Sequence, residues 1–160
     1  MKLKDAVAII TGGGSGLGKA IADRICQEGG NALLVDIDHQ AGLHTCKQLQ
    51  ELYGSGCAVF IRFDVTDMHG YSYLFERCEQ EFKQPVNLLI NNAGITGEPT
   101  FFDPDLPTHW RRVIDIDLTA VVRGTQVGLG KMQQNGGVII NVSSVAGLMP
   151  VKFAPVYAAA

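Results

Sequence analysis

The chain has 160 residues, of which 46% are hydrophobic and 18% charged, and its formal net charge at pH 7 is −3. This length and balance predict one folded domain over residues 1–160 and exclude an intrinsically disordered chain. Lys and Arg are scattered and no apolar run is long enough for a signal peptide or a membrane span, so we expect a cytoplasmic protein with no nucleic-acid or membrane partner.

The cysteines and histidines form no pattern typical of a metal site or a disulfide framework. The four cysteines include no CxxC pair, and the four histidines are isolated from one another: Cys26, Cys46, Cys57 and Cys78; His39, His44, His69 and His109. We expect reduced thiols in or near the core and no bound metal.

Short apolar runs alternate with longer helical segments, which is the pattern of βα units around a parallel sheet. Strands are predicted at residues 6–11, 32–36, 58–63, 87–91 and 138–143, and helices at 17–28, 39–52, 68–82 and 108–134. The strands are nearly continuous apolar runs, as expected when helices cover both faces of the sheet. The predicted fold class is α/β, a Rossmann-type doubly wound parallel sheet, with a ligand crevice at the carboxyl ends of the strands.

A glycine-rich segment, TGGGSGLG at residues 11–18, follows the first predicted strand and opens the first helix. Glycine permits positive φ and close backbone approach, and a helix N-terminus offers free amides and a positive dipole end to pyrophosphate. A tight turn alone would explain the glycines. Their place between a strand and a helix favours dinucleotide binding.

Asp36 ends the second predicted strand, eighteen residues after Gly18, which is close to the spacing of an acidic ribose ligand. A carboxylate there can accept hydrogen bonds from both ribose hydroxyls and would repel a 2′-phosphate. Neither Ser15 nor residues 38–39 supply a cation for such a phosphate. The pattern favours NAD over NADP, and a cap on the second helix is a role that Asp36 can combine with ribose binding.

Polar residues also close the third and fourth predicted strands. Asp64-Val65 can contact adenine by hydrogen bonding and packing, whereas capping of the next helix by Asp64 or Thr66 is an equal alternative. In NNAG at residues 91–94, two amides can bridge neighbouring strand ends, and the small pair leaves room for a ribose. A turn with a left-handed glycine is the alternative for this segment.

Ser144 follows the fifth predicted strand, and Tyr157 lies thirteen residues later at the start of a predicted helix. Two hydroxyls that converge on one carbonyl can polarise it and pass a proton. Tyrosine has an ordinary pKa of roughly 10, so acid–base work near neutral pH requires a neighbouring cation. A lysine four residues after Tyr157 would share its helix face and would follow directly on Ala160.

Together these motifs resemble the short-chain dehydrogenase/reductase family. The run from Gly137 to Tyr157, with VSSVAGLMPV and PVY, is similar to its 15-hydroxyprostaglandin dehydrogenase branch. The resemblance implies hydride transfer between NAD and a small or medium apolar alcohol or ketone, and a homodimer or homotetramer when complete. It also implies that two C-terminal strands, their helices and a substrate lid are missing, so that residues 1–160 are the front of a longer enzyme. A non-catalytic NAD-binding module is the alternative.

The resemblance assigns a role to each motif residue. It implies that the pyrophosphate of the cofactor is contacted by Gly12, Ser15, Gly16, Leu17 and Gly18, and the adenosine ribose by Asp36. It also implies that Asp64 and Val65 contact the adenine and that Asn92 contacts the nicotinamide ribose. It implies that Ser144 positions the substrate oxygen and that Tyr157 is the general acid–base, next to the cofactor.

Asp117 departs from the family, which usually has an asparagine there that supports a water and proton path. One helical stripe contains Trp110, Val113, Ile114, Asp117 and Val121, so Asp117 should face the interior, where an unpaired carboxylate is costly. We include Asp117 among the catalytic candidates in a paired or relay role. An ordinary solvated or capped aspartate is the alternative.

Two further features bear on the substrate. Ala154 stands three residues before Tyr157, where the prostaglandin branch carries a glutamine that contacts substrate, so a prostaglandin substrate is not assumed. The loop 97–105, expected near the mouth of the crevice, carries no recognisable specificity code. The sequence therefore predicts a reaction class without a substrate.

Overall fold

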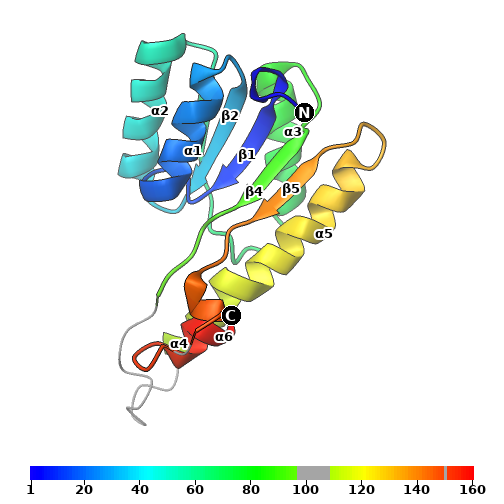
Figure 1. Cartoon of the computed structure of the whole chain (residues 1–160). Helices are drawn as coiled ribbons and strands as arrows, with labels where there is room; N and C mark the ends of the chain where they lie inside the picture. Colours follow the sequence, from blue (N-terminus) through cyan, green and yellow to red (C-terminus); the bar gives the residue numbers. More distant parts are fainter. Residues whose placement is uncertain (97–108, 150) are drawn as a thin grey trace.

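Strands and helices alternate along the chain in the computed structural model, which describes residues 1–96, 109–149 and 151–160 (Figure 1). The elements are η1 (Leu3–Asp5), β1 (Val7–Thr11), α1 (Gly16–Gln27), β2 (Asn31–Asp36), α2 (His39–Tyr53), β3 (Ala58–Arg62), α3 (Tyr71–Phe82), β4 (Leu88–Asn91), α4 (His109–Val113), η2 (Ile114–Thr119), α5 (Ala120–Met132), β5 (Val138–Asn141), η3 (Val145–Gly147) and α6 (Pro155–Ala159). All five predicted strands are present, with ends that differ by no more than two residues.

The strands form one parallel sheet in the order β3-β2-β1-β4-β5. Successive side chains of a strand point to opposite faces, and the buried residues accordingly fall into two clusters. Val7 and Ile9 of β1 pack with α3 and α5. Ala8 and Ile10 of the same strand pack with α1 and α2 on the other face. The predicted doubly wound architecture is confirmed.

Helix α3 begins at Tyr71, three residues later than the sequence predicts. The intervening residues are held in two turns by aspartate side chains. Oδ1 of Asp64 accepts hydrogen bonds from the backbone N–H and the hydroxyl of Thr66, and Oδ1 of Asp67 accepts from the N–H groups of His69 and Gly70. Such local side-chain hydrogen bonds compete with the backbone hydrogen bonds of a helix, so α3 begins later in the sequence.

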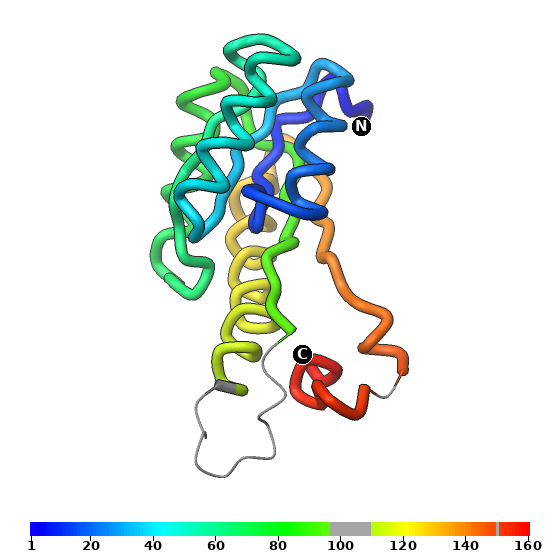
Figure 2. Tube along the Cα trace, turned by 90° about the vertical axis from the view of Figure 1, so that its left-hand side faces the viewer, coloured from blue at the N-terminus to red at the C-terminus, as the bar shows by residue number. Residues whose placement is uncertain are grey.

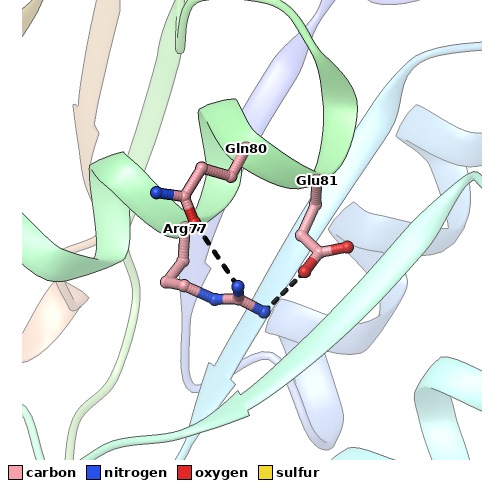
Figure 3. A network of polar contacts seen from close by, with 3 residues as sticks. All are labelled: Arg77, Gln80 and Glu81. Atoms are coloured by element: carbon pink, nitrogen blue, oxygen red, sulfur yellow. Dashed lines mark hydrogen bonds and ion pairs between the residues drawn. The ribbon is translucent and has the colours of Figure 1, made fainter.

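The outward side of α3 carries a short charged network (Figure 3). The Arg77 guanidinium donates to Oε1 of Gln80 and forms an ion pair with Glu81 one turn along the helix. Leu74 and Phe75 of the same helix are fully buried. Pairs three and four residues apart contribute roughly 0.2–0.5 kcal/mol each, so the buried face supplies most of the stability of this helix.

The long helix predicted at residues 108–134 is not uniform, and residue 108 lies outside the described residues. A six-residue π-helix, η2, separates α4 from α5. The N–H of Ala120 bonds the carbonyl of Asp115, five residues earlier. An apolar pattern does not distinguish α from π pairing, and short π segments are frequent at functional sites.

Helices α4, α6 and η2 gather beyond the carboxyl ends of the central strands. Figure 2 shows α5 running past the sheet toward this group, and α6 contacts both α4 and η2. At one side of the sheet, β5 is an edge strand in which Val138 is 40% and Ile140 is 44% exposed. No helix in the described ranges is long and apolar enough to cross a membrane.

Candidate functional site

The glycine loop leaves β1 and opens α1 at the carboxyl edge of the sheet. Gly12 and Gly16 have φ of +65° and +51°, which favours glycine at both positions. A Cβ on Gly16 would meet nothing within 4 Å, whereas one on Gly12 would lie 2.9 Å from Nδ2 of Asn92. Gly18 is buried, and a Cβ there would collide with the carbonyl oxygen of Gly12. Gly16 thus leaves open space beside the helix N-terminus, and Gly18 permits close packing behind it.

A cavity of about 430 Å³ lies beside this loop. It brings together most of the residues predicted to bind the cofactor: Gly12, Ser15, Gly16, Leu17, Asp36, Asp64, Val65 and Asn92. Gly18 and Tyr157 do not line it. Residues from the ends of β1, β2, β3 and β4 therefore meet at one edge, as the topology requires of parallel strands. We call this space the nucleotide cavity.

Asp36 is held in the cavity wall by backbone donors. Its Oδ2 accepts a hydrogen bond from the N–H of Gly14 at 2.9 Å, and its Oδ1 accepts from the N–H of Asp38 at 3.0 Å. The cap of α2 is Asp38, whose side chain accepts from the N–H of Ala41. The capping alternative for Asp36 is therefore wrong, and its carboxylate faces the glycine loop.

Asp64 lines the same cavity as an ionised group. Its hydrogen bond from the backbone N–H of Thr66 holds its pKa below the ordinary value, with further lowering by the Thr66 hydroxyl and by Arg112 and partial opposition from burial. Neither Asp64 nor Thr66 caps α3, whose N-cap is Gly70, so that alternative is wrong. Arg112 also lines the cavity, and its place was not predictable because it comes from a distant helix.

The end of β4 is fixed by a hydrogen-bonded junction at Thr11. The buried hydroxyl of Thr11 accepts from the N–H groups of Asn92 at 2.9 Å and Ala93 at 3.0 Å, and donates to the carbonyl of Ile90. Nδ2 of Asn92 donates back to the carbonyl of Thr11 at 2.9 Å. The predicted bridging of strand ends by amides is confirmed, although no sequence pattern indicated the hydroxyl at its centre.

The side-chain amide of the neighbouring residue, Asn91, links β4 to the strand on its other side. Its Nδ2 donates to Oδ1 of Asn141 at 2.8 Å, which joins β4 to β5. Gly94 has no positive φ, unlike the five described glycines that do, so the left-handed turn considered for residues 91–94 does not form. The side-chain amides of Asn91 and Asn92 thus link neighbouring strand ends at the edge of the sheet where the site lies.

A second cavity of about 500 Å³ adjoins the first across residues 92–95 and Leu17, which line both. Ser144, Tyr157 and Asp117 all line this second space, which we call the catalytic cavity. They come from the segment after β5, from α6 and from η2. The structure therefore brings the three predicted catalytic side chains together from positions up to forty residues apart.

The two carboxylate oxygens of Asp117 differ in their hydrogen bonding. Its Oδ1 accepts from the N–H of Ile95 at 2.9 Å, while its buried Oδ2 has no hydrogen-bond partner in the described structure. Burial raises the pKa of this carboxyl, and the Ile95 bond opposes the rise. The prediction that Asp117 faces the interior is confirmed. The stripe proposed for it holds only in part, because Val113 is buried whereas Trp110 is 38% exposed.

Ser144 and Tyr157 sit on short helical turns. The Ser144 hydroxyl oxygen accepts from the N–H of Ala146 at 3.2 Å and so caps η3. Tyr157 is half-buried on α6, which has Pro155 at its first position, where a missing N–H costs no helical bond. Capping orients the serine oxygen while leaving its proton free to donate into the cavity.

Thr45 is a further supporting residue that sequence analysis missed. Its buried hydroxyl on α2 donates to the carbonyl of Gly14 at 2.7 Å. The glycine loop is therefore held from α2 through Thr45 and from β2 through Asp36. A threonine inside a helix carries no sequence signal for such a contact.

The chain matches characterised proteins over almost its whole length. The family model described as "short chain dehydrogenase" matches residues 6–160. The chain belongs to the short-chain dehydrogenase family. Among its relatives, the 15-hydroxyprostaglandin dehydrogenase [NAD(+)] of Homo sapiens is 36% identical over 163 residues, which cover 99% of this chain and 58% of the relative. The NADP-dependent (R)-specific alcohol dehydrogenase of Lentilactobacillus kefiri is 33% identical over 92% of this chain and 58% of the relative.

A solved member of the short-chain dehydrogenase family has the same fold. The crystal structure of a short chain dehydrogenase/reductase from Burkholderia phymatum in complex with NAD superposes with a TM-score of 0.88 at 30% identity, over 99% of this chain and 56% of that one. The chain thus spans somewhat more than half the length of the relatives it matches.

The described residues fit a dinucleotide and offer no metal site. The open space at Gly16, the helix N-terminus beside it and the oriented Asp36 carboxylate match the requirements for pyrophosphate and ribose. Within residues 1–96, 109–149 and 151–160, no group of three His, Cys, Asp or Glu side chains is placed to hold a metal ion. The loop 97–105 lies outside the described residues.

Proposed function

We propose that this chain is the cofactor-binding and catalytic part of an oxidoreductase that transfers a hydride between NAD and an alcohol or carbonyl substrate. The observation that carries the proposal is the adjacency of the two cavities. The nucleotide cavity holds the glycine loop and Asp36, and the catalytic cavity holds Ser144 and Tyr157. The shared wall at residues 92–95 would set the reacting end of the cofactor beside the two hydroxyls.

The choice of NAD rests on Asp36. Its carboxylate is oriented by the backbone N–H groups of Gly14 in the glycine loop and of Asp38, and it can accept from two ribose hydroxyls. A 2′-phosphate would meet that negative charge. The cation in this cavity, Arg112, acts electrostatically on Asp64. The family contains NADP-dependent members such as the Lentilactobacillus kefiri enzyme. Membership of the family therefore does not decide between NAD and NADP, and the choice rests on the residues of this chain.

In the proposed reaction, Tyr157 exchanges a proton with the substrate oxygen and Ser144 donates a hydrogen bond to the same oxygen. When bound, NAD supplies the hydride acceptor at its nicotinamide ring. Ser144 is suited to its role because its oxygen is already fixed by the N–H of Ala146. Asp117 would hold Ile95 at the wall shared by the cavities and leave its second oxygen for a proton or a water.

The first test is a titration of the protein with NADH and with NADPH, in which the fluorescence of the ligand reports binding. We expect NADH to bind at least tenfold more tightly. Asp36→Asn should weaken NADH binding by roughly 10- to 100-fold, the value of a hydrogen bond to a charged group, and should narrow the gap to NADPH. Asp38→Asn is the matched control, because Asp38 caps α2 and does not line the cavity. Equal affinities of the unmodified protein for the two cofactors would contradict the NAD assignment.

A second candidate function is an NAD-binding module without turnover. It is favoured by the wall of the catalytic cavity, where no Lys, Arg or His occurs among the described lining residues to place a positive charge beside the two hydroxyls. Assays with NAD and a panel of secondary alcohols separate the two functions. Turnover that is lost in Tyr157→Phe with NADH affinity retained supports the enzyme, and NADH binding without any turnover supports the module.

The proposed assembly is a homodimer or homotetramer. Leu118, Val122 and Leu129 expose apolar surface along η2 and α5, at 41%, 60% and 63%. Burial of such a stripe against a second copy would remove it from water. Sedimentation velocity should then show a dimer or larger species that Val122→Lys weakens.

A further inference from the structure

Three of the four cysteines gather at the amino edge of the sheet, away from both cavities. The thiol of Cys26, near the end of α1, donates to the carbonyl of Cys57 at 3.3 Å. The thiol of Cys46, on α2, donates to the carbonyl of Ala58 at 3.5 Å. These thiols are far apart in the sequence, and the packing of α1 and α2 over the start of β3 brings them together.

Within this group, the Cys26 thiol lies directly against the backbone of Cys57. The bond from the Cys26 thiol to the Cys57 carbonyl brings the two residues into contact, and the Cys57 thiol itself donates to the carbonyl of Leu49 on α2 at 3.4 Å. Cys78 is apart from the group, on α3, where its thiol faces the carbonyl of Ala8 on β1. Two cysteines that contact each other from separate packed segments are the neighbours that a disulfide requires.

The two thiols differ in access. Cys57 is partly exposed, while Cys26 is only 3% exposed. Burial raises the pKa of the Cys26 thiol, and the neighbouring Cys57 and Asp23 add to the rise. A reagent in solution therefore meets Cys57 first, and Cys26 is reached only through Cys57.

We propose that Cys26 and Cys57 are a reversible thiol-oxidation site that takes a small disulfide such as oxidised glutathione. In the first step the Cys57 sulfur attacks the small disulfide, forms a mixed disulfide and releases one small thiol, which takes up the proton lost by Cys57. In the second step the Cys26 sulfur attacks the Cys57 sulfur and releases the second small thiol with the Cys26 proton. Two protein thiols are oxidised and one small disulfide is reduced, so the exchange balances without another reactant.

The resulting cross-link would join the end of α1 to the start of β3 across thirty-one residues of chain. In the chain-entropy view it restricts the unfolded state, with the gain growing with loop length. We expect the midpoint of thermal unfolding to rise by on the order of 10 °C for a chain of this size. The pair lies at the opposite edge of the sheet from the nucleotide cavity, so this inference stands independently of the proposed function.

The test is intact-mass analysis of the reduced protein during incubation with oxidised glutathione. The expected product has lost two hydrogens and yields a peptide that joins Cys26 to Cys57. Cys26→Ala should stop at the mixed disulfide on Cys57, and Cys57→Ser should form neither species at this site. Cys46→Ser is the matched control and should form the cross-link at the unmodified rate.

Three results would overturn the proposal. One is a folded, unmodified protein that forms no internal disulfide under these conditions. Another is loss of the cross-link in Cys46→Ser, which would make Cys46 the true partner. The third is an oxidised protein whose thermal midpoint is unchanged or lower, since a cross-link that fits the native packing must stabilise it. Should Cys26→Ala fail to fold, Cys26→Ser replaces it, and the peptide map of the unmodified protein decides alone.

Discussion

Replacement of Thr11 by valine tests whether its hydroxyl holds the wall between the two cavities. Valine keeps the shape of threonine, so the change removes only the hydrogen bonds. Two N–H groups, those of Asn92 and Ala93, would lose their acceptor, and the carbonyl of Ile90 would lose a donor. The hydroxyl is buried, with Thr11 only 3% exposed, so water cannot easily replace it.

The size of the effect follows from these two orphaned donors. A buried donor left without a partner costs about 1–3 kcal/mol. Because Asn92 and Ala93 are only partly buried, the lower end applies, and we expect the free energy of unfolding to fall by about 2–3 kcal/mol. This is a large fraction of the roughly 5–15 kcal/mol typical of a domain.

Thr11→Ser is the control, because serine retains the hydroxyl and loses one methyl, worth about 0.8 kcal/mol. Urea unfolding of the three proteins measures the difference, and NADH titration measures whether the shared wall is displaced. The valine variant should be less stable than the serine variant and should bind NADH more weakly. A valine variant as stable as the serine variant, with unchanged NADH affinity, would refute the reasoning.

Four further substitutions test other parts of the structure. Burial raises the pKa of Asp117 in the folded state, so the fold loses stability as pH rises from the ordinary aspartate pKa, roughly 3.9, through the raised value. Asp117→Asn should therefore gain stability over the unmodified protein at neutral pH and not at pH values below that window, as measured by urea midpoints across pH. Tyr71→Phe should lower the free energy of unfolding by about 1 kcal/mol, because the buried hydroxyl bonds backbone carbonyls, and an unchanged urea midpoint would exclude such a role. Gly42→Ala should lower the free energy of unfolding by about 1–3 kcal/mol, because the added methyl would overlap the Phe60 ring. Gly130→Ala should raise it by up to about 1 kcal/mol, because the space around Gly130 is open. Thermal melts in which both substitutions shift the unfolding midpoint in the same direction would contradict this packing.

The sequence was sufficient for the order of the elements and for most of the nucleotide cavity. Strands buried on both faces are continuous apolar runs, so β1 to β5 can be located without a structure. Parallel strands bring their carboxyl ends to one edge, which is why Asp36 and Asp64 could be placed beside the glycine loop from their positions alone. The same rule placed Ser144 at that edge.

Contacts between distant elements were decided only by the tertiary structure. No periodicity marks the π-helix that carries Asp117, because it depends on one changed backbone pairing within an apolar helix. Arg112 reaches the nucleotide cavity from a helix that is remote in sequence, and Thr45 holds the glycine loop from α2. The contact of Cys26 with Cys57 likewise depends on how the end of α1 lies against the segment before β3. Local patterns record which face of an element is buried, whereas the partners of a polar side chain depend on the packing of elements that the chain brings together only on folding.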